Sequence, residues 1–247
     1  MRKEMMQIDG GNGGGQLLRT ALSLSAATSK PFTIKNIRSQ REQSGLKPQH
    51  LTAVKALQQI CDADVTGASS GSTELSFSPK KIKGGTYTFD IGTAGSSTLL
   101  LQTIIPVAIH AETATTITVL GGTDTKWCPP SMHMQHVLLP LLRKTGIDVE
   151  MTIEKYGFYP KGGGKITAKI DSQQIIKALD LQQRGEERQK EVVAYASADL
   201  KSKNVAERMI AAFVKEMREE NWRAHKKYVE TISSGCFLHG HVNYENY

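Results

Sequence analysis

The sequence contains little cysteine, few aromatic residues and no long hydrophobic run. Its three cysteines, Cys61, Cys128 and Cys236, lie far apart and form neither the paired spacing of a disulfide framework nor that of a zinc site. No apolar stretch approaches the roughly 20 residues that cross a bilayer, and the N-terminus lacks the apolar segment of a signal peptide. These absences predict a soluble protein of a reducing compartment, the cytoplasm, without a membrane partner.

The chain carries a modest excess of positive charge. It has 31 lysine and arginine residues against 24 aspartate and glutamate residues, a formal net charge of +7. Such an excess favours polyanionic partners, although many proteins that bind no nucleic acid share it. The length of 247 residues is enough to bury a substantial core in one or two domains.

The most informative segment is residues 38–57. Arg38 and Arg41 follow a strand-like stretch, residues 32–37, and Gln49 begins an apolar-periodic helix. Two guanidiniums, an amide and a helix N-terminus at one place suit an anion that is held at two points. A solvated basic loop is the alternative for this segment taken alone.

The first two thirds of the chain contain the same pattern twice. In each copy a glycine turn precedes an apolar helix, then come a strand, a second helix and two closing strands, and Gln49 and Gln135 occupy corresponding places. The expected helices are residues 17–27, 49–60, 99–109 and 135–144, and the expected strands are 32–34, 64–65, 74–77, 116–119, 147–153 and 165–170. The pattern predicts an α/β (α+β) fold of tandem modules, each with two helices on one face of a four-stranded sheet.

We expect a large domain over residues 1–180, divided into repeats at about 1–85 and 86–180. From there the composition changes, and residues 181–247 are predicted to form part of a small domain. In it, Asn204 and Glu207 have the spacing of a capping box at the start of a helix. Residues 231–247 have little periodicity, which predicts a disordered or atypical tail.

Four glycine motifs surround the arginine segment. They are residues 13–19 (GGGQLLR), 92–102 (GTAGSSTLLLQ), 121–130 (GGTDTKWCPP) and 157–164 (GFYPKGGG). Tight strand-to-helix turns need glycine whatever the function, so the glycines alone decide nothing. At the first motif Gln16 and Arg19 follow on the first helical turns, where amides and a guanidinium could share one phosphate.

Together, in this order and spacing, the five motifs closely resemble those of the RNA 3′-terminal phosphate cyclase family, over roughly residues 5–215. The resemblance implies three repeats with a small inserted domain. It also implies conversion of an RNA 3′-phosphate to a 2′,3′-cyclic phosphate with ATP and Mg²⁺ or Mn²⁺. The resemblance further implies a histidine–AMP adduct that passes AMP to the 3′-phosphate, whose oxygen is a poor leaving group until it is adenylated.

The resemblance assigns two groups of binding residues. For the RNA 3′-phosphate it implies Arg19, Arg38, Arg41 and Gln49. For ATP it implies Gln16, Gln102, Pro129 and Pro130, with the prolines against the adenine. The non-functional alternatives are a helix-face amide for Gln102 and a stiffened loop for the two prolines.

The chain departs from the family pattern at two places. Asn12 stands where the family has a metal-holding glutamate, and an amide is a weaker ligand for a hard cation than a carboxylate. No catalytic residue is assigned, because the family's nucleophilic histidine belongs to a C-terminal repeat whose motif is not found here. We therefore expect a truncated member with impaired turnover, whose uncovered repeat face needs a partner or a homo-oligomer.

The histidines offer no obvious replacement for that nucleophile. His133 and His136 share a helix face and His239 and His241 alternate, but neither pair has the further ligands that a metal site needs. The alternative function is a non-catalytic, cyclase-like RNA-binding or ribosome-biogenesis protein. The enolpyruvate transferases, which share this repeat type, are a more distant possibility.

Overall fold

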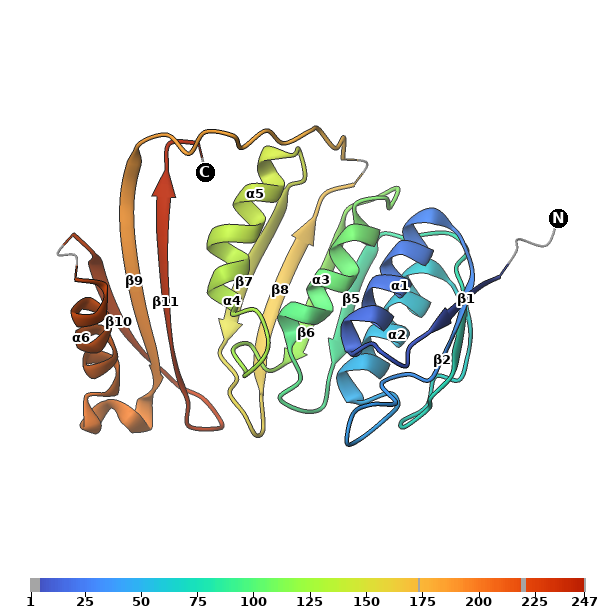
Figure 1. Ribbon diagram of the computed structural model, residues 1–247, viewed down its shortest axis with the longest axis horizontal. Helices are drawn as coiled ribbons and strands as arrows, with labels where there is room; N and C mark the ends of the chain where they lie inside the picture. The colour runs from blue at the N-terminus through green and yellow to red at the C-terminus, as the bar shows by residue number, and fades with distance from the viewer. Residues whose placement is uncertain (1–4, 173, 219–220, 247) are drawn as a thin grey trace.

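The computed structural model describes residues 5–172, 174–218 and 221–246. It contains three sheets, which lie side by side along the longest axis (Figure 1). The N-terminal sheet lies at the right of that view, the second sheet in the centre and the third at the left. In the described ranges no helix combines the length and the apolarity needed to cross a bilayer.

The first sheet has the strand order β1-β2-β4-β3. Strand β1 runs parallel to β2, whereas β4 is antiparallel to both β2 and β3. The elements of this module are β1 (Met6–Asp9), α1 (Gly15–Thr28), β2 (Phe32–Lys35), α2 (Pro48–Cys61), β3 (Asp64–Thr66) and β4 (Leu75–Ser78).

The second sheet repeats this arrangement, with the order β5-β6-β8-β7 and the same parallel and antiparallel pairs. Its elements are β5 (Gly85–Asp90), α3 (Ser97–Ala108), β6 (Thr115–Gly121), α4 (Ser131–His133), α5 (Leu139–Lys144), β7 (Val149–Lys155) and β8 (Gly164–Ile170). The predicted α/β fold of tandem two-helix, four-stranded modules is therefore confirmed, although the sequence pattern did not locate β1 and β5.

One predicted helix start is wrong. The helix expected from residue 135 begins at Ser131, and Gln135 and His136 lie in a π-helical turn (Met134–Leu138) between α4 and α5. The start is set by the Asp124 carboxylate, which accepts hydrogen bonds from the backbone N–H and the hydroxyl of Ser131. The side chain that begins this helix thus lies seven positions upstream of it, outside the periodic segment.

A single hydrophobic core joins the two modules. Helices α1 and α2 of the first module both pack on α3 of the second. Leu22, Leu57 and Leu101, one from each of these helices, are fully buried. The Ser23 hydroxyl donates to the Thr103 carbonyl across the α1–α3 contact at 2.8 Å. The two modules therefore position one another, and α1 and α2 keep fixed places relative to the loops of the second sheet.

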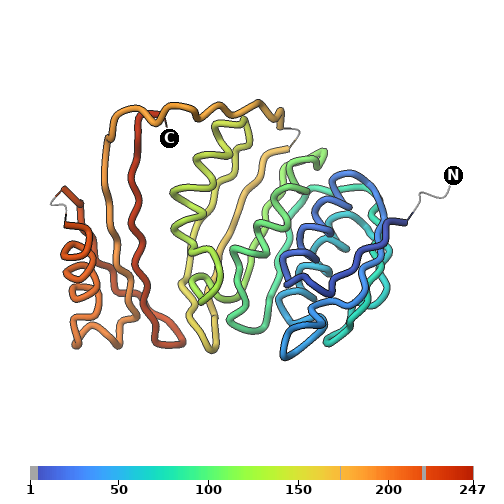
Figure 2. Tube along the Cα trace, viewed as in Figure 1, coloured from blue at the N-terminus to red at the C-terminus, as the bar shows by residue number. Residues whose placement is uncertain are grey.

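The third sheet has the order β10-β9-β11, with β9 parallel to β10 and antiparallel to β11. Its elements are β9 (Glu187–Ser197), a 3₁₀ helix (Ala198–Lys203), α6 (Val205–Met217), β10 (Arg223–Val229) and β11 (Cys236–Tyr244). Figure 2 shows the largely irregular segment 174–186 running along one edge to reach it. The predicted division of the chain into domains stays a prediction.

Two expectations for this part are wrong. Asn204 adopts a left-handed conformation and its side chain makes no cap, while the Glu207 carboxylate accepts hydrogen bonds from Lys226 and Tyr228 on β10. Disorder of the tail is the second wrong expectation, because residues 236–244 form β11, whereas an atypical tail stays a prediction and Tyr247 lies outside the described residues. Polar and apolar residues alternate only weakly in β11, so its sequence does not predict a strand. The strand is stabilised by its pairing along β9.

Candidate functional site

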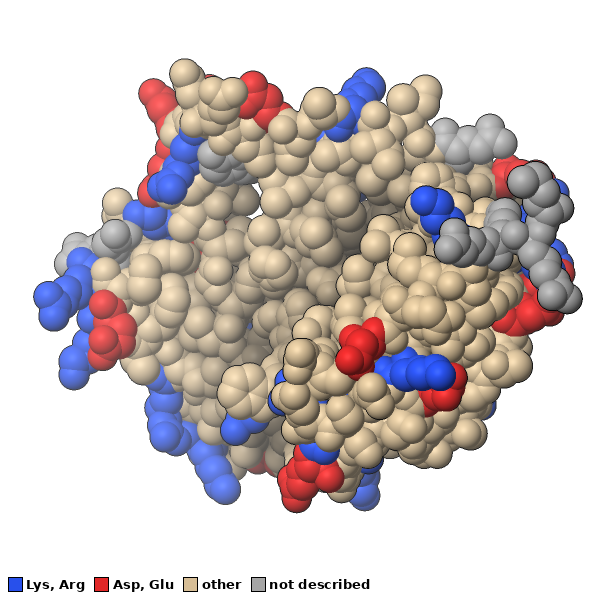
Figure 3. All heavy atoms as spheres, turned by 45° about the vertical axis from the view of Figure 1, so that its right-hand side comes forward, with Lys and Arg blue, Asp and Glu red and all other residues tan. Residues whose placement is uncertain are grey.

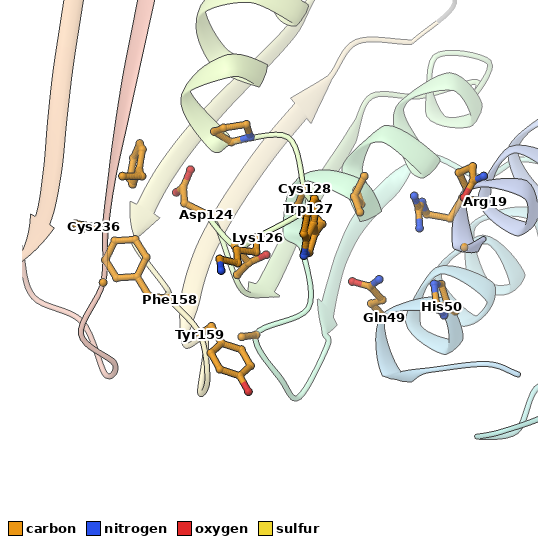
Figure 4. Close-up of a pocket in the computed structure, with 18 of the residues that line it drawn as sticks. Arg19, Gln49, His50, Asp124, Lys126, Trp127, Cys128, Phe158, Tyr159 and Cys236 are labelled. Carbon is orange, nitrogen blue, oxygen red and sulfur yellow. The ribbon is translucent and has the colours of Figure 1, made fainter. Parts of the chain in front are cut away.

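All three parts of the molecule contribute to one cleft of about 1110 Å³. Helices α1 and α2 supply one wall, the loop after β6 and the β7–β8 hairpin supply the middle, and the start of β11 supplies the far side (Figure 4). Figure 3 shows that the molecular surface is hollowed, with lysine and arginine side chains along its lower left edge. All four predicted phosphate-binding residues line the cleft on the side of α1 and α2: Arg19 on α1, Gln49 on α2, and Arg38 and Arg41 on the loop between β2 and α2.

The N-terminus of α1 opens into this wall. A Cβ atom placed on Gly15 would overlap the His50 Nε2 atom and lie 3.1 Å from Arg19 Nη1. One placed on Gly14 would lie 3.4 Å from Arg41 Nη2. Glycine therefore lets two guanidiniums and an imidazole approach the first turn of a helix, where backbone N–H groups have no partner within the helix. The arrangement is suited to an anion such as a phosphate.

His50 is held in a neutral form. It is buried, with 3% of its surface exposed, and its Nδ1 atom accepts a hydrogen bond from the Lys47 N–H at 3.2 Å. Burial, reinforced by the charges of Arg38, Arg19 and Lys47, lowers the pKa of His50 to about 4. Since Nδ1 accepts, the proton of the neutral ring is on Nε2, which faces Gly15 as a donor.

The three arginines of the cleft differ in the hydrogen bonds that their guanidinium groups already form. Arg38 donates from Nη1 to the carbonyl oxygens of Gln43 and Gly45, both at 2.9 Å, and so braces its own loop. In the described ranges, none of Arg19, Arg38 and Arg41 forms an ion pair with a carboxylate. Burial lowers the pKa of the half-buried Arg19, but a guanidinium remains charged. Of the three arginines that line the cleft, Arg38 has its Nη1 group engaged, and Arg19 and Arg41 are the ones best placed to donate to a ligand.

Gln49 links the two modules at the edge of the cleft. Its Oε1 atom accepts a hydrogen bond from the Ser96 N–H at 3.2 Å, and the Ser96 hydroxyl in turn caps α3 by accepting from the Leu99 N–H. With the oxygen engaged, the amide N–H₂ group of Gln49 is the end that can donate into the cleft. This orientation suits an anionic ligand.

The glycine motifs of the second module pack against one another beneath the cleft. Gly122 donates to the Gly95 carbonyl at 2.8 Å, and Thr123 donates to the Gly157 carbonyl at 2.9 Å. A Cβ atom on Gly122 would overlap the Ala94 carbonyl, and one on Gly157 would overlap Gly164. Close backbone approach therefore accounts for these glycines, whereas Gly15 lines the cleft itself.

The residues predicted to bind ATP are only partly brought together. Gln16 and Pro130 line the cleft, but Gln102 lies with Gln16 and Arg19 in a separate pocket of about 300 Å³ that is lined by residues of α1 and α3. The Pro129 carbonyl accepts from the Thr98 hydroxyl at 2.8 Å, and Pro129 is outside the cleft lining. The roles predicted for these residues stay predictions.

The predicted metal position lacks suitable partners. The Asn12 side-chain oxygen accepts a hydrogen bond from Gln40, and the Asp9 carboxylate accepts from Asn36 and Gly11. No group of three or more His, Cys, Asp or Glu side chains in the described part of the chain could hold a metal ion. Outside the cleft, His136 stacks on His241 at 4.9 Å between ring centroids, with His239 at 6.2 Å. The two histidine pairs of the sequence therefore meet, without forming such a group.

Sequence reasoning missed part of the cleft. Lys126, Trp127 and Cys128 line it from the loop after β6, and Phe158 and Tyr159 line it from the β7–β8 hairpin. All five lie inside motifs that were identified from their glycines and prolines. The signal that could have found Trp127 and Tyr159 was the presence of an aromatic residue within a glycine- and proline-rich motif.

Comparisons with known proteins agree with the motif pattern. A family model described as RTC, RNA 3′-terminal phosphate cyclase, matches residues 10–236. An RNA 3′-terminal phosphate cyclase of Koribacter versatilis (strain Ellin345) is 48% identical over 192 residues, which are 77% of this chain and 54% of that protein. One from Staphylothermus marinus (strain ATCC 43588) is 50% identical over 169 residues, 68% of this chain and 47% of that protein.

The chain thus spans about half the length of the curated relatives it matches. Among solved structures, the EPSP synthase from Acinetobacter baumannii aligns with a TM-score of 0.42 at 17% identity, covering 71% of this chain and 32% of that one.

Proposed function

The chain belongs to the RNA 3′-terminal phosphate cyclase family, and from that premise we propose that its cleft binds the 3′-phosphate end of an RNA. The observation that carries the proposal is the convergence of Arg19, Arg41 and the His50 Nε2 donor on the N-terminus of α1. Donors from two helices and a loop surround one point, as a terminal phosphate with several free oxygens requires.

The proposed reaction is the ATP-dependent closure of that phosphate. RNA 3′-phosphate and ATP give RNA 2′,3′-cyclic phosphate, AMP and pyrophosphate. The residues of this chain contribute binding and orientation: charge on the phosphate is offset by Arg19 and Arg41, and the N–H₂ group of Gln49 donates to it. Gln16 and Pro130 line the same cleft, which favours the binding of a nucleotide beside the RNA end.

A divalent metal ion enters no step of this proposal. Asn12 is engaged with Gln40, and the described residues provide no carboxylate cluster, so the donors near the head of the chain do not fit such an ion. The need for Mg²⁺ or Mn²⁺, and the covering of the repeat face by a partner or a second copy, stay predictions.

A second candidate is recognition of the RNA end without chemistry by this chain. Among the described residues that line the cleft, His50 is the one histidine. Its Nδ1 lone pair already accepts from Lys47 and its Nε2 atom carries the proton, so neither nitrogen is free to attack a phosphorus atom. This arrangement favours binding by the 247-residue chain, with weak or absent turnover.

Binding is tested with matched arginine variants and a short RNA that ends in a 3′-phosphate. Arg41→Ala removes a cation of the cleft, whereas Arg208→Ala removes an exposed cation on α6. We expect the first to weaken binding about tenfold or more and the second to leave it within about twofold, because a hydrogen bond to a charged group contributes about 1.5–3 kcal/mol. Equal effects would contradict a specific phosphate site.

Chemistry is tested separately with ATP labelled at the α-phosphate. If the chain performs the reaction, label becomes attached to protein and the RNA acquires a 2′,3′-cyclic end. If it only recognises the RNA end, neither product forms, while the preference for a 3′-phosphate remains. The two candidates are thus separated by one incubation.

A further inference from the structure

Two aromatic side chains that line the cleft are exposed to solvent. Trp127 is 97% exposed and Tyr159 is 76% exposed, whereas Phe32 and Phe77 in the core are almost completely buried. Within the described residues, neither ring contacts another ring or forms a side-chain hydrogen bond. An exposed indole or phenol ring lacks the stabilisation that burial gives to aromatic groups. The exposure of these two rings therefore indicates a surface that binds a ligand.

Both side chains lie on loops that are fixed by hydrogen bonds. The loop that carries Trp127 is fixed at one end by Asp124 and Ser131 and at the other by the hydrogen bond from Thr98 to the Pro129 carbonyl. Trp127 itself has φ of +66°, a conformation that is rare for a bulky residue. The surroundings therefore hold this ring outward, and its exposure is not that of a loose loop.

Tyr159 is displayed in a similar way. The preceding Phe158 is buried and packs edge-on against Phe237, with 6.3 Å between ring centroids. Gly162 donates to the Phe158 carbonyl at 2.8 Å, and the Lys161 N–H donates to the Ser233 hydroxyl at 3.2 Å. The tip of the hairpin is thus anchored to the third sheet on one side of Tyr159, which remains free to contact a ligand.

The two rings lie in the same cleft as the cationic wall. In the view of Figure 4, Trp127 stands between Arg19 and Phe158, and Tyr159 lies at the lower rim. Lys126, next to Trp127, is exposed and also lines the cleft. Cations with unpaired aromatic faces beside them form the combination that binds single-stranded nucleic acid, because phosphates meet the cations and bases stack on the rings.

We propose that Trp127 and Tyr159 form a stacking platform for the unpaired bases at the RNA 3′ end. The inference rests on the proposed function, since the arginines position the terminal phosphate whose attached nucleotides reach the rings. Every base has a π-face, so the stacking platform makes binding tolerant of sequence but selective for unpaired ends. A base-paired terminus binds more weakly because its bases are already stacked.

The test uses tryptophan fluorescence. The chain has two tryptophans, so a Trp222→Phe background leaves Trp127 as the sole reporter. A single-stranded oligoribonucleotide with a 3′-phosphate is expected to quench the emission saturably, and inorganic phosphate is not. Trp127→Ala and Tyr159→Ala are each expected to weaken oligonucleotide binding about tenfold, while Trp127→Phe, which keeps a stacking face, changes it by about threefold or less.

Each other outcome contradicts a defined part of the account. Binding that depends on Arg41 but neither quenches Trp127 nor responds to Trp127→Ala overturns the stacking platform and leaves the proposed function standing. Quenching by ATP alone, with none by the oligonucleotide, assigns the ring to adenine and overturns the RNA assignment. No preference for the 3′-phosphorylated oligonucleotide over its 3′-hydroxyl form overturns the proposed function, and the stacking platform with it.

Discussion

Individual residues decide how closely the cationic groups approach helix α1. At Gly15 the missing side chain leaves the space that His50 Nε2 occupies. We predict that Gly15→Ala displaces His50 and weakens binding of a 3′-phosphorylated RNA by about tenfold, the loss of one hydrogen bond to a charged group. The measurement is the dissociation constant from a fluorescence-anisotropy titration.

Gly71→Ala provides the control for this glycine. Gly71 has φ of +78°, so alanine strains the backbone, but a Cβ atom there meets nothing within 4 Å and the residue is outside the cleft. It is expected to lower stability by about 1 kcal/mol and to leave binding unchanged. A similar loss of binding in both variants would mean that a general loss of stability, not the space beside His50, is responsible.

The second residue-scale prediction concerns acid. The pKa of His50 falls from 6.5 to about 4 on folding, so between these values the unfolded chain binds more protons than the folded chain. The free energy of unfolding therefore decreases as the pH falls from about 6.5 to about 4, and it is restored as the pH rises. We expect His50→Asn to reduce this dependence in denaturation curves recorded across that range.

The wild-type chain is the reference for the slope. His239, whose pKa is also lowered to about 4, is present in both proteins, so its contribution is common to the two sets of curves and their difference isolates His50. An unchanged slope in His50→Asn would show that His50 is not held neutral by the fold.

Among the elements, the loop between β6 and α4 depends most on one side chain. The Asp124 carboxylate binds the N–H and hydroxyl groups of Ser131 and thereby starts α4, and burial raises its pKa. We predict that Asp124→Ala lowers the free energy of unfolding by about 1–3 kcal/mol, because the Ser131 groups lose their acceptor. Urea denaturation measures the loss.

Asp148→Ala is the comparison for Asp124. Asp148 forms an exposed ion pair with Arg143 at 2.9 Å, of the kind that contributes about 0–1 kcal/mol. The account requires the larger loss at Asp124. Equal losses would mean that the loop after β6 is not fixed by this carboxylate.

The elements also show how far the sequence determines the structure. The helix predicted for residues 17–27 is α1 (Gly15–Thr28), because its apolar periodicity alone defines a buried face. The start of α4 was missed because a distant carboxylate sets it, and β11 was missed because its ladder with β9 stabilises a strand of weak pattern. Pairing partners and distant caps are not visible in local periodicity.

The same limit applies to the site. The motifs predict that Arg19, Arg41 and Gln49 lie close together, because the starts of α1 and α2 and the loop after β2 meet at one end of the module. The position of Gln102, in a pocket apart from the cleft, could not be predicted from the sequence, because it depends on how α3 packs on α1. Trp127 was missed because exposure is a property of the folded loop, not of its composition.

At the scale of the whole molecule, the cleft exists because three parts meet. Helix α1 and the loop after β2 bring the arginines, the loop after β6 and the β7–β8 hairpin bring the aromatic residues, and the third sheet closes the far side through Phe237. The common core of the two modules fixes the cationic wall relative to the aromatic one. The proposed recognition of an RNA end therefore requires the assembled chain.

The most direct test is to compare the affinities of the intact chain for one oligoribonucleotide ending in a 3′-phosphate or in a 3′-hydroxyl, at two salt concentrations. The account predicts a preference of about tenfold or more for the 3′-phosphate, which persists when salt weakens both affinities, because contacts to the RNA backbone are common to the two ligands. Equal affinities that fall together with salt would show general backbone binding and would contradict a terminal-phosphate site.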